Sequence, residues 1–477
     1  MAITPATQSR AAAVQAVTSA NYLDIQNDGW AKQYLPDLMA KEAEVFGKRT
    51  ISGFLSQVGA EESMAADQVI WSEQGRLHLS YKCEMNDASA NTIDIIQNID
   101  GVAQTTDHGI RVGDQVLIAG HGQTITGRVS LAAAGNQTIT VQPYGYAALS
   151  NAGWGDSDDT NTILVFGSEN AKGESYLGGR SNKPSFTTFT NKPIILRDQY
   201  EVSGSDVAQI GWVEVSGEDG QNGYYWYLKA EGDTRSRFTD YCEMSMIESE
   251  KVAEVSAIAL PTDGGVGTAG TEGLFSAVKS RGHQSSGVMG VNAATDLAEF
   301  DAILAEFDKN GAIEENMMFV NRATALAVDD MLASMNSYGA GGTSWGVFDN
   351  DEDMALNLGF SGFRRGSYDF YKSDWKYLND LATRGGINAA ATGGEAIRGI
   401  MIPAGVSSVY DQSLGKNLKR PFLHVRYRAS KLESRKFKTW VTGSVGAKTS
   451  DLDAMTMNFL SERCLVVQGA NNFMLLN

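Results

Sequence analysis

Residues 191–215 read NKPIILRDQYEVSGSDVAQIGWVEV, a stretch rich in β-branched and aromatic side chains with a charged residue every few positions. This composition is typical of extended chain. Directly after it, residues 224–251 carry an apolar stripe and a Glu231–Arg235 pair at i,i+4 spacing, which together predict one long helix. We expect that the extended arm cannot bury itself against its own domain, and that another copy of the same chain covers it.

The composition describes an acidic, globular chain. Its 477 residues are 42% hydrophobic, which allows real cores and roughly two to four domains. The formal net charge is -18, and this acidity argues against free nucleic-acid binding, because contacts to phosphate need basic groups. We expect neither a secretory signal nor a membrane span, since no run of about 18 apolar residues occurs. Three widely spaced cysteines predict free, buried thiols in a reducing compartment: Cys83, Cys242 and Cys464.

Residues 90–179 contain short, evenly spaced strand signals separated by Gly-Asn and Gly-Asp turns. The segment RVGDQVLI at 111–118 follows the pattern of a small SH3-like or OB-like barrel, a shape that by itself indicates no ligand. The candidate strands are 92–96, 115–118, 124–129, 138–141 and 162–166. Before them, alternating apolar residues predict a β-hairpin over 67–85 with its turn at Gly75. We therefore predict a small all-β unit here.

From residue 293 onward, helix and strand signals alternate and predict an α/β layer. Asn292 or Thr295 is a candidate N-cap for a helix that carries Phe300 and Phe307 on its apolar stripe. The further elements expected are a strand at 317–320, a helix at 323–335, and strands at 368–371 and 399–402.

The C-terminal part reads as strands whose two faces differ in character. Leu423, Val425 and Tyr427 predict an apolar face on one strand. The residues that alternate with them predict a basic face: His424, Arg426 and Arg428. Two interpretations stay open for this face, namely a patch that meets a neighbouring subunit's carboxylates, or solvated charges. A last strand is expected at 463–468.

Three motifs resemble functional sites but lack the context that the chemistry needs. GVGTAG at 265–270 matches a dinucleotide-binding pattern, but no strand signal precedes it. GTSWG at 342–346 places Ser344 in a nucleophile-elbow pattern, yet loop residues flank it and only His424 follows as a base. The acidic run at 349–353 lacks the spacing of a calcium loop. We predict no catalytic, cofactor or metal site, and keep a serine hydrolase using Ser344 as an alternative.

Four pieces follow one another along the chain: an N-terminal arm, an extended β segment, a long helix, and an α/β region that closes with C-terminal strands. The stretches to compare are KPIILRDQYEVSGSDVAQI at 192–210, YWYLKAE at 225–231 and CLVVQGANNF at 464–473. In these stretches and in this order the chain resembles the major capsid proteins of tailed bacteriophages, and it looks most like the large-insert type that includes the crAss-like group. The resemblance implies an α+β, tailed-phage major capsid fold with an N-arm, an extended β loop, a spine helix, peripheral and axial domains, and a small all-β insertion domain.

The resemblance divides the chain into seven parts. These are the N-terminal arm and helix (1–62), the extended-loop and peripheral strands (63–89), the all-β insertion domain (90–179), the return of the extended loop (180–220), the spine helix and peripheral domain (221–290), the axial α/β domain (291–400), and the C-terminal peripheral and axial strands (401–477). Two features of some family members have no assigned counterpart: a charged, cleaved scaffolding segment, and a Lys–Asn crosslink between neighbours.

The resemblance also implies a structural role without enzymatic activity. Copies of the chain would self-assemble into hexamers and pentamers of an icosahedral capsid that encloses double-stranded DNA and contacts it non-specifically. Portal, decoration or scaffolding proteins would be partners, no membrane would be involved, and the chain would be assembled in the bacterial host cytoplasm and reside in the virion. Arg197, Asp198, Glu201, Arg426 and Arg428 would then make intersubunit contacts. The alternatives are the serine hydrolase and another oligomeric phage tail or adhesin component.

Overall fold

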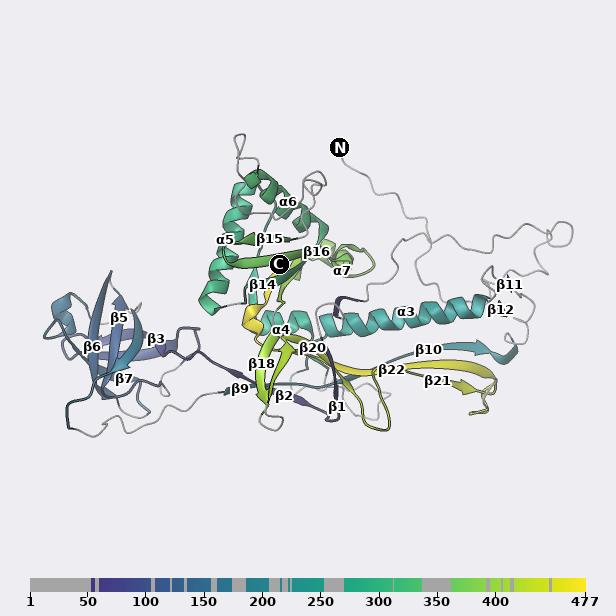
Figure 1. The fold of residues 1–477 in the computed structure, drawn as a ribbon, viewed down its shortest axis with the longest axis horizontal. Helices are drawn as coiled ribbons and strands as arrows, with labels where there is room; N and C mark the ends of the chain where they lie inside the picture. Colours follow the sequence, from purple (N-terminus) through teal and green to yellow (C-terminus); the bar gives the residue numbers. More distant parts are fainter. Residues whose placement is uncertain are drawn as a thin grey trace. The chain divides into compact units, whose positions relative to one another are not determined.

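The computed structural model describes residues 53–55, 60–103, 108–120, 122–132, 135–155, 161–173, 186–205, 215–216, 222–223, 225–252, 270–311, 313–336, 362–391, 395–404, 406–411, 416–445 and 448–477. The chain divides into two compact units. The first contains 1–57, 195–245 and 435–461, and the second contains 58–194, 246–434 and 462–477. Figure 1 draws the helices and strands of both units. They combine helices and sheets throughout, which confirms the expected mixed α and β content.

The first unit packs one long helix against a group of strands. Its elements are α3 (Tyr225–Glu248, up to residue 245), β10 (Ile194–Ser203, from residue 195), β21 (Lys438–Gly443), and the first half of β22 (Ala454–Val467). Both β21 and β10 pair with β22. The helix contributes Phe238 and Cys242, one turn apart, to a core that also contains Phe459. The predicted helix over 224–251 is therefore confirmed.

The second unit contains strands that lie far apart in the sequence. β1 (Ala60–Met64) runs parallel to β20 (Leu423–Arg428), and β20 pairs antiparallel with the second half of β22. A separate antiparallel pair consists of β2 (Val69–Gln74) and β9 (Phe186–Asn191). Met64, Trp71 and Cys464 are buried in one small core with Phe189 packed against it. The final strand predicted at 463–468 is the end of β22.

Six strands of the second unit close into a barrel in the order β3-β4-β7-β6-β5-β8 (Figure 1). Their bounds are β3 (Ser80–Asp87), β4 (Thr92–Asn98), β5 (Asp114–Gly120), β6 (Gln123–Ala132), β7 (Thr138–Pro143) and β8 (Asn161–Ser168). Alternate side chains such as Ile95, Val116 and Ile163 fill the interior. All five candidate strands of this region are confirmed, and β3 joins them from the segment before residue 90.

The expected β-hairpin over 67–85 is wrong. β2 pairs with β9, where Val69 lies opposite Asn191, whereas β3 pairs with β4 and β8 inside the barrel. The alternation of apolar residues predicts that a segment is a strand, but it carries no information about a partner more than a hundred residues away.

A six-stranded sheet and two helices form the α/β layer expected after residue 291. The sheet has the order β13-β23-β17-β14-β16-β15. The bounds are β13 (His283–Ser285), β14 (Glu315–Val320), β15 (Gly362–Arg365), β16 (Tyr368–Asp374), β17 (Gly399–Pro403), β23 (Met474–Leu476), α5 (Ala293–Asn310) and α6 (Arg322–Asn336). Phe300, Phe307 and Phe370 share its core. Asn292 is the N-cap of α5, because its side chain accepts a hydrogen bond from the Thr295 amide.

The remaining elements are short. They are η3 (Leu149–Ala152), β11 (Val215–Ser216), β12 (Asn222–Gly223), α4 (Leu274–Arg281), α7 (Lys376–Asn379), α8 (Arg384–Ala390), β18 (Val406–Asp411), β19 (Lys416–Pro421) and η5 (Ala470–Asn472). β11 pairs with β12 and β18 with β19, both antiparallel. None of the helices in the described part of the chain combines the length and apolarity that crossing a bilayer requires.

The extended arm differs from expectation in one respect. Residues 194–203 form β10 and pair with β22 of the same chain, so the expectation that the arm cannot lie against its own domain is wrong for these residues. The reason is that β22, with 14 residues, pairs with β10 as well as with β20 and β21. Residues 206–214, most of the N-terminal arm, and the motifs at 265–269, 342–346 and 349–353 lie outside the described residues.

Candidate assembly surfaces

Strand β10 ends the order of its sheet, and among the described strands its second edge has no partner. Its side chains alternate in exposure. Val202 is buried, while Ile195, Arg197 and Glu201 are exposed, and Ile195 retains 53% of its surface. The edge of a sheet is a template for pairing with another chain, because a further strand can hydrogen-bond to it. The predicted contact residues Arg197 and Glu201 therefore lie on a face that a neighbouring molecule can reach.

The third predicted contact residue of the arm, Asp198, has a partner within the chain. The Arg237 guanidinium of α3 donates hydrogen bonds to one Asp198 carboxylate oxygen, at 3.1 and 3.3 Å. Both side chains are largely covered, at 31% and 19% exposure for Arg237 and Asp198 respectively. This ion pair connects β10 to α3 inside the first unit. Of the three charged residues predicted to contact a neighbour, Asp198 is therefore paired internally, while Arg197 and Glu201 are exposed.

The basic face predicted for β20 is neutralised in part by the chain's own carboxylates. Arg426 lies 3.0 Å from Glu62 on β1. Arg428 pairs with Asp67 and lies 3.4 Å from Glu462 on β22. The expectation of a basic, outward His424 is wrong, because its side chain is fully buried where β20 lies between β1 and β22. The intersubunit role of Arg426 and Arg428 stays a prediction.

A network around Arg281 holds the strand pair β2–β9 in place. The Arg281 guanidinium lies 4.4 Å from the Phe189 ring centre and 5.6 Å from that of Trp71, and it pairs with Glu272 at 2.7 Å. Glu73 accepts hydrogen bonds from the Trp71 indole and from the Gly469 amide. The chain leads into the barrel after β2 and returns from it at β9, so the network stabilises the strand pair at the base of the barrel.

Asn191, the first residue of the opening stretch, is fully buried and fully hydrogen-bonded. Its amide group donates to the carbonyls of Leu465, at 2.7 Å, and Glu272, at 3.0 Å. Its oxygen accepts from the Thr271 hydroxyl and from the amides of Glu272 and Lys192. One side chain thus joins the end of β9 to β22 and to the segment before α4. Neither this site nor Arg281 was found by sequence reasoning, because their partners share no local spacing.

A buried carboxylate on α3 holds the described part of the N-terminal region. Glu243 accepts hydrogen bonds from the Gly53 amide at 2.8 Å and the Leu55 amide at 2.9 Å. Burial raises the pKa of the Glu243 carboxyl, although these amide hydrogen bonds act in the opposite direction. The contact places residues 53–55 within the first unit, beside its long helix.

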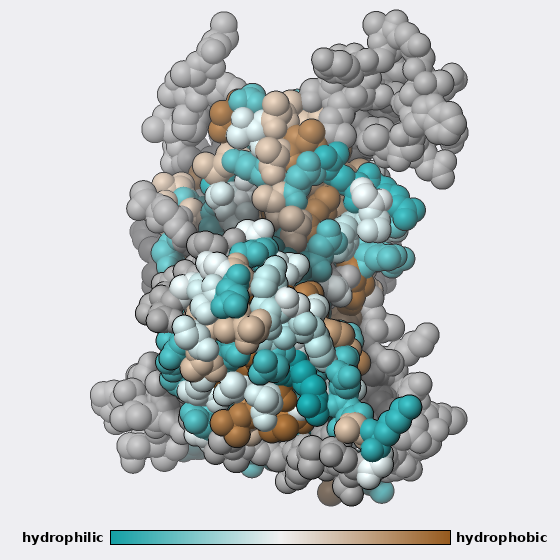
Figure 2. Space-filling model, turned by 90° about the vertical axis from the view of Figure 1, so that its left-hand side faces the viewer, coloured by the Kyte–Doolittle hydropathy of each residue, from teal (hydrophilic) through white to brown (hydrophobic). Residues whose placement is uncertain are grey.

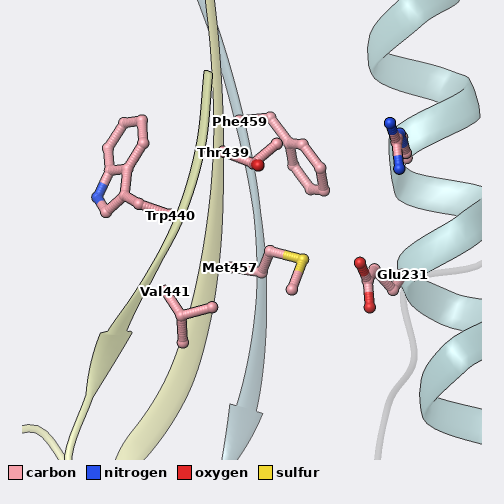
Figure 3. A pocket seen from close by; sticks show the side chains of 7 residues that line it. Glu231, Thr439, Trp440, Val441, Met457 and Phe459 are labelled. Atoms are coloured by element: carbon pink, nitrogen blue, oxygen red, sulfur yellow. The ribbon is translucent and has the colours of Figure 1, made fainter. Parts of the chain in front are cut away.

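A small hollow lies between α3 and the strands of the first unit (Figure 3). Met457 and Phe459 point from β22 towards the helix, Glu231 points from the helix towards the strands, and Trp440 lies on the other side of β21. The complete lining is Glu231, Arg235, Thr439, Trp440, Val441, Met457 and Phe459. The volume of about 140 Å³ is below the roughly 300–1,000 Å³ typical of pockets for small-molecule ligands.

The barrel side of the molecule presents a mostly polar surface. In Figure 2 teal and white residues predominate, and brown residues occur in small groups, one of them low in the view. Leu131, Tyr144 and Phe166 are apolar or aromatic residues of the barrel region that stay at least half exposed. The Tyr144 hydroxyl donates to Glu169 and accepts from Gln115, so this ring is fixed by polar partners.

Of the two groups expected for a serine hydrolase, only one lies among the described residues. Ser344 lies outside them, and its expected base His424 is buried in the sheet. No cluster of three or more potential metal ligands occurs in the described ranges. Cys83, Cys242 and Cys464 are buried and form no disulfide, as the sequence predicts. Burial raises the pKa of both Cys83 and Cys464 to about 12, which keeps these thiols protonated and unreactive.

Comparisons with known proteins give matches among solved structures alone. No protein-family model matches the chain, and neither does a curated protein. A structure titled as the capsid of the cyanophage P-SCSP1u is 9% identical, with a TM-score of 0.41, and the match covers 97% of this chain and 98% of that chain. The asymmetric unit of the mature capsid of bacteriophage PhiM1 is 7% identical, with a TM-score of 0.40 and coverage of 96% and 98%. A structure from Microbacterium phage Oxtober96 is 9% identical, with a TM-score of 0.38 and coverage of 95% and 99%. These matches span nearly the whole chain and come from phages, but at TM-scores below 0.5 the likeness alone assigns no function.

Proposed function

We propose that this chain is the major capsid subunit of a tailed bacteriophage, a structural protein that self-assembles into a closed shell around double-stranded DNA. In this assignment α3 is the spine helix, the segments around β2, β9 and β10 belong to the extended loop, and the six-stranded barrel is the insertion domain. Hexamers and pentamers are the expected building blocks, with portal, scaffolding or decoration proteins as partners. The role is non-enzymatic.

The observation that carries the proposal is the outer edge of β10. Among the described strands it stands at one end of its sheet, it presents Ile195, Arg197 and Glu201 to the outside, and α3 supports it from within the unit through Asp198 and Arg237. A supported edge strand of ten residues is an aggregation hazard in a monomer and an assembly element in a shell. The net charge of -18 supports a container that holds DNA without adhering to it.

The test is the assembly state of the purified full-length chain. We expect closed particles of uniform size by negative-stain microscopy, together with a large sedimenting species in equilibrium with capsomer-sized oligomers. A chain that remains monomeric at high concentration contradicts the proposal. Tubes or fibres favour the tail or adhesin alternative.

Exchange of Arg197 for Glu tests the edge itself. We expect the variant to fold normally, since the side chain is exposed, and to need a few-fold higher concentration for assembly at low salt, because its charge contact with a neighbour is reversed. Lys172→Glu, an equal change at an exposed residue of the barrel region, is the matched control. Equal assembly of both variants at all salt concentrations excludes Arg197 from an interface.

A further inference from the structure

Residues 429–434, here called the knob, form a tight turn after β20. An isolated bridge pairs Ala429 with Ser434, and the Ala429 amide donates to the Met64 carbonyl of β1. Within the turn, the Ser430 amide donates to the Glu433 carbonyl at 2.8 Å. The Ser430 hydroxyl oxygen accepts from the amides of Leu432 and Glu433, at 3.3 and 3.2 Å. The knob is therefore held in one conformation by its own hydrogen bonds.

The tip of the knob is Leu432, whose side chain is 98% exposed. Single exposed leucines are common on protein surfaces, so exposure alone identifies no interface. Here the leucine stands on a hydrogen-bonded turn, so that little conformational entropy is lost when another surface buries it. It is also flanked by two opposite charges, Lys431 and Glu433, which are both exposed.

The hollow beside α3 matches this tip in size and has apolar side chains at its floor. Met457 and Phe459 give it an apolar floor, and its volume is about 140 Å³. A cavity of about 150 Å³ can hold a molecule of benzene's size, so the volume of this hollow is large enough for one leucine side chain. Leu432 of the same chain does not occupy it, since that side chain is almost completely exposed.

The two charged residues at the hollow are opposite in sign to the two charged residues of the knob. Glu231 and Arg235 line the hollow from α3 and lie one helical turn apart, which places their side chains about 5–6 Å from each other at Cβ. Lys431 and Glu433 lie on either side of Leu432 in the turn, and both are exposed. When Leu432 enters the hollow, Lys431 can therefore meet Glu231 while Glu433 meets Arg235.

We propose that the knob of one copy inserts Leu432 into the α3 hollow of a second copy, with Lys431 facing Glu231 and Glu433 facing Arg235. The inference rests on the proposed shell function, because it needs copies of the chain side by side. Each copy carries one knob and one hollow, so the contact is heterologous and can be repeated around a ring. We assign a second copy as the occupant because every copy carries the hollow, and Glu231 and Arg235 in it are opposite in charge to Lys431 and Glu433 of the knob.

Two kinds of variant test the contact by assembly. Leu432→Ser should raise the concentration needed for assembly roughly 10- to 100-fold, since burial of one leucine is lost. Leu381→Ser removes another leucine that is 72% exposed and should leave that concentration unchanged. Lys431→Glu and Glu231→Lys should each weaken assembly, and the two changes combined should restore it, as expected for a charge pair.

Disulfide trapping tests the geometry directly. Leu432→Cys and Thr439→Cys variants are prepared separately, mixed under assembly conditions and oxidised. The three native cysteines are buried, so we expect disulfide-linked dimers when both variants are present and far fewer with either alone. Leu381→Cys mixed with Thr439→Cys is the control and should give none above background.

The outcomes separate the contact from the shell. If the wild type forms particles while Leu432→Ser assembles equally well and the mixed cysteine variants give no dimers above the control, the knob contact is wrong and the shell function stands. If the wild type stays monomeric at every concentration, both are wrong. Reduced assembly of Leu432→Ser together with specific mixed dimers supports the contact.

Discussion

At the scale of single residues, the second unit depends on buried polar side chains that connect distant segments. Asn191 makes five hydrogen bonds, and four of them involve Thr271, Glu272 and Leu465, which lie far along the chain. A buried polar group that loses its partner costs about 1–3 kcal/mol. Such residues tolerate substitution poorly, because the donor and the acceptor of each hydrogen bond are both buried and the remaining group cannot bond to water instead.

Asn191→Ala should therefore destabilise the second unit by about 3 kcal/mol or more, because it leaves several backbone groups unpaired in the interior. The measurement is the midpoint of chemical unfolding followed by tryptophan fluorescence, since Trp71 lies in the neighbouring core. Asn151→Ala, at an exposed residue of η3, is the control and should shift the midpoint little. A shift for Asn191→Ala no larger than for this control would contradict the role of the network.

The residue-scale sequence predictions succeed where the cause is local. The Asn292 cap needs an amide three residues away, and burial of the three cysteines follows from their apolar surroundings. The burial of His424 and the pairing of Arg426 with Glu62 depend on β1, which lies more than 360 residues away in the sequence. No local pattern contains that information.

At the scale of elements, α3 contains a glycine that lowers the stability of the helix. Gly232 is exposed, lies in the helix interior, and has open space where a Cβ would stand. Gly232→Ala should stabilise the helix by about 1 kcal/mol, because alanine loses less conformational freedom. The readout is the thermal unfolding midpoint of the first unit, which should rise by a few degrees.

A second glycine serves as the contrasting control. Gly311 ends α5 with φ 60°, a left-handed conformation that alanine adopts at a cost. Gly311→Ala should therefore lower the unfolding midpoint of its own unit by a similar amount. If both substitutions shift stability in the same direction, backbone conformation is not what distinguishes the two sites.

The helices α3, α5 and α6 and the barrel strands could be predicted because their periodicity lies within ten to twenty residues. Strand partners could not. The hairpin over 67–85 fails because β2 finds its partner at β9, and the exposed-arm expectation fails because β10 pairs with β22. At the candidate assembly surfaces, exposed Arg197 and Glu201 follow from alternation along β10, whereas the Asp198–Arg237 pair depends on how α3 lies against the strands.

At the scale of the whole molecule, the barrel is a self-contained insertion between two paired strands. Its six strands close on one another, so it leaves no open sheet edge, and its core consists of its own residues. The chain enters it after β2 and returns through β9, where Gln74 lies opposite Phe186. The barrel can therefore be removed without separating the strands that flank it.

Replacing residues 75–185 by an Asn-Gly turn should convert β2 and β9 into a simple hairpin, since two-residue turns of this type match the twist of antiparallel strands. We expect the shortened chain to remain folded, with its other helices retained in circular dichroism, and to form particles of the same size by negative-stain microscopy. The Arg281 network should survive, because Trp71, Glu73 and Phe189 all remain. A shortened chain that folds but no longer assembles shows that the barrel makes essential contacts between copies. A shortened chain that aggregates shows that the rest of the second unit depends on the barrel for its stability. That result would contradict the independence expected from the barrel's separate core.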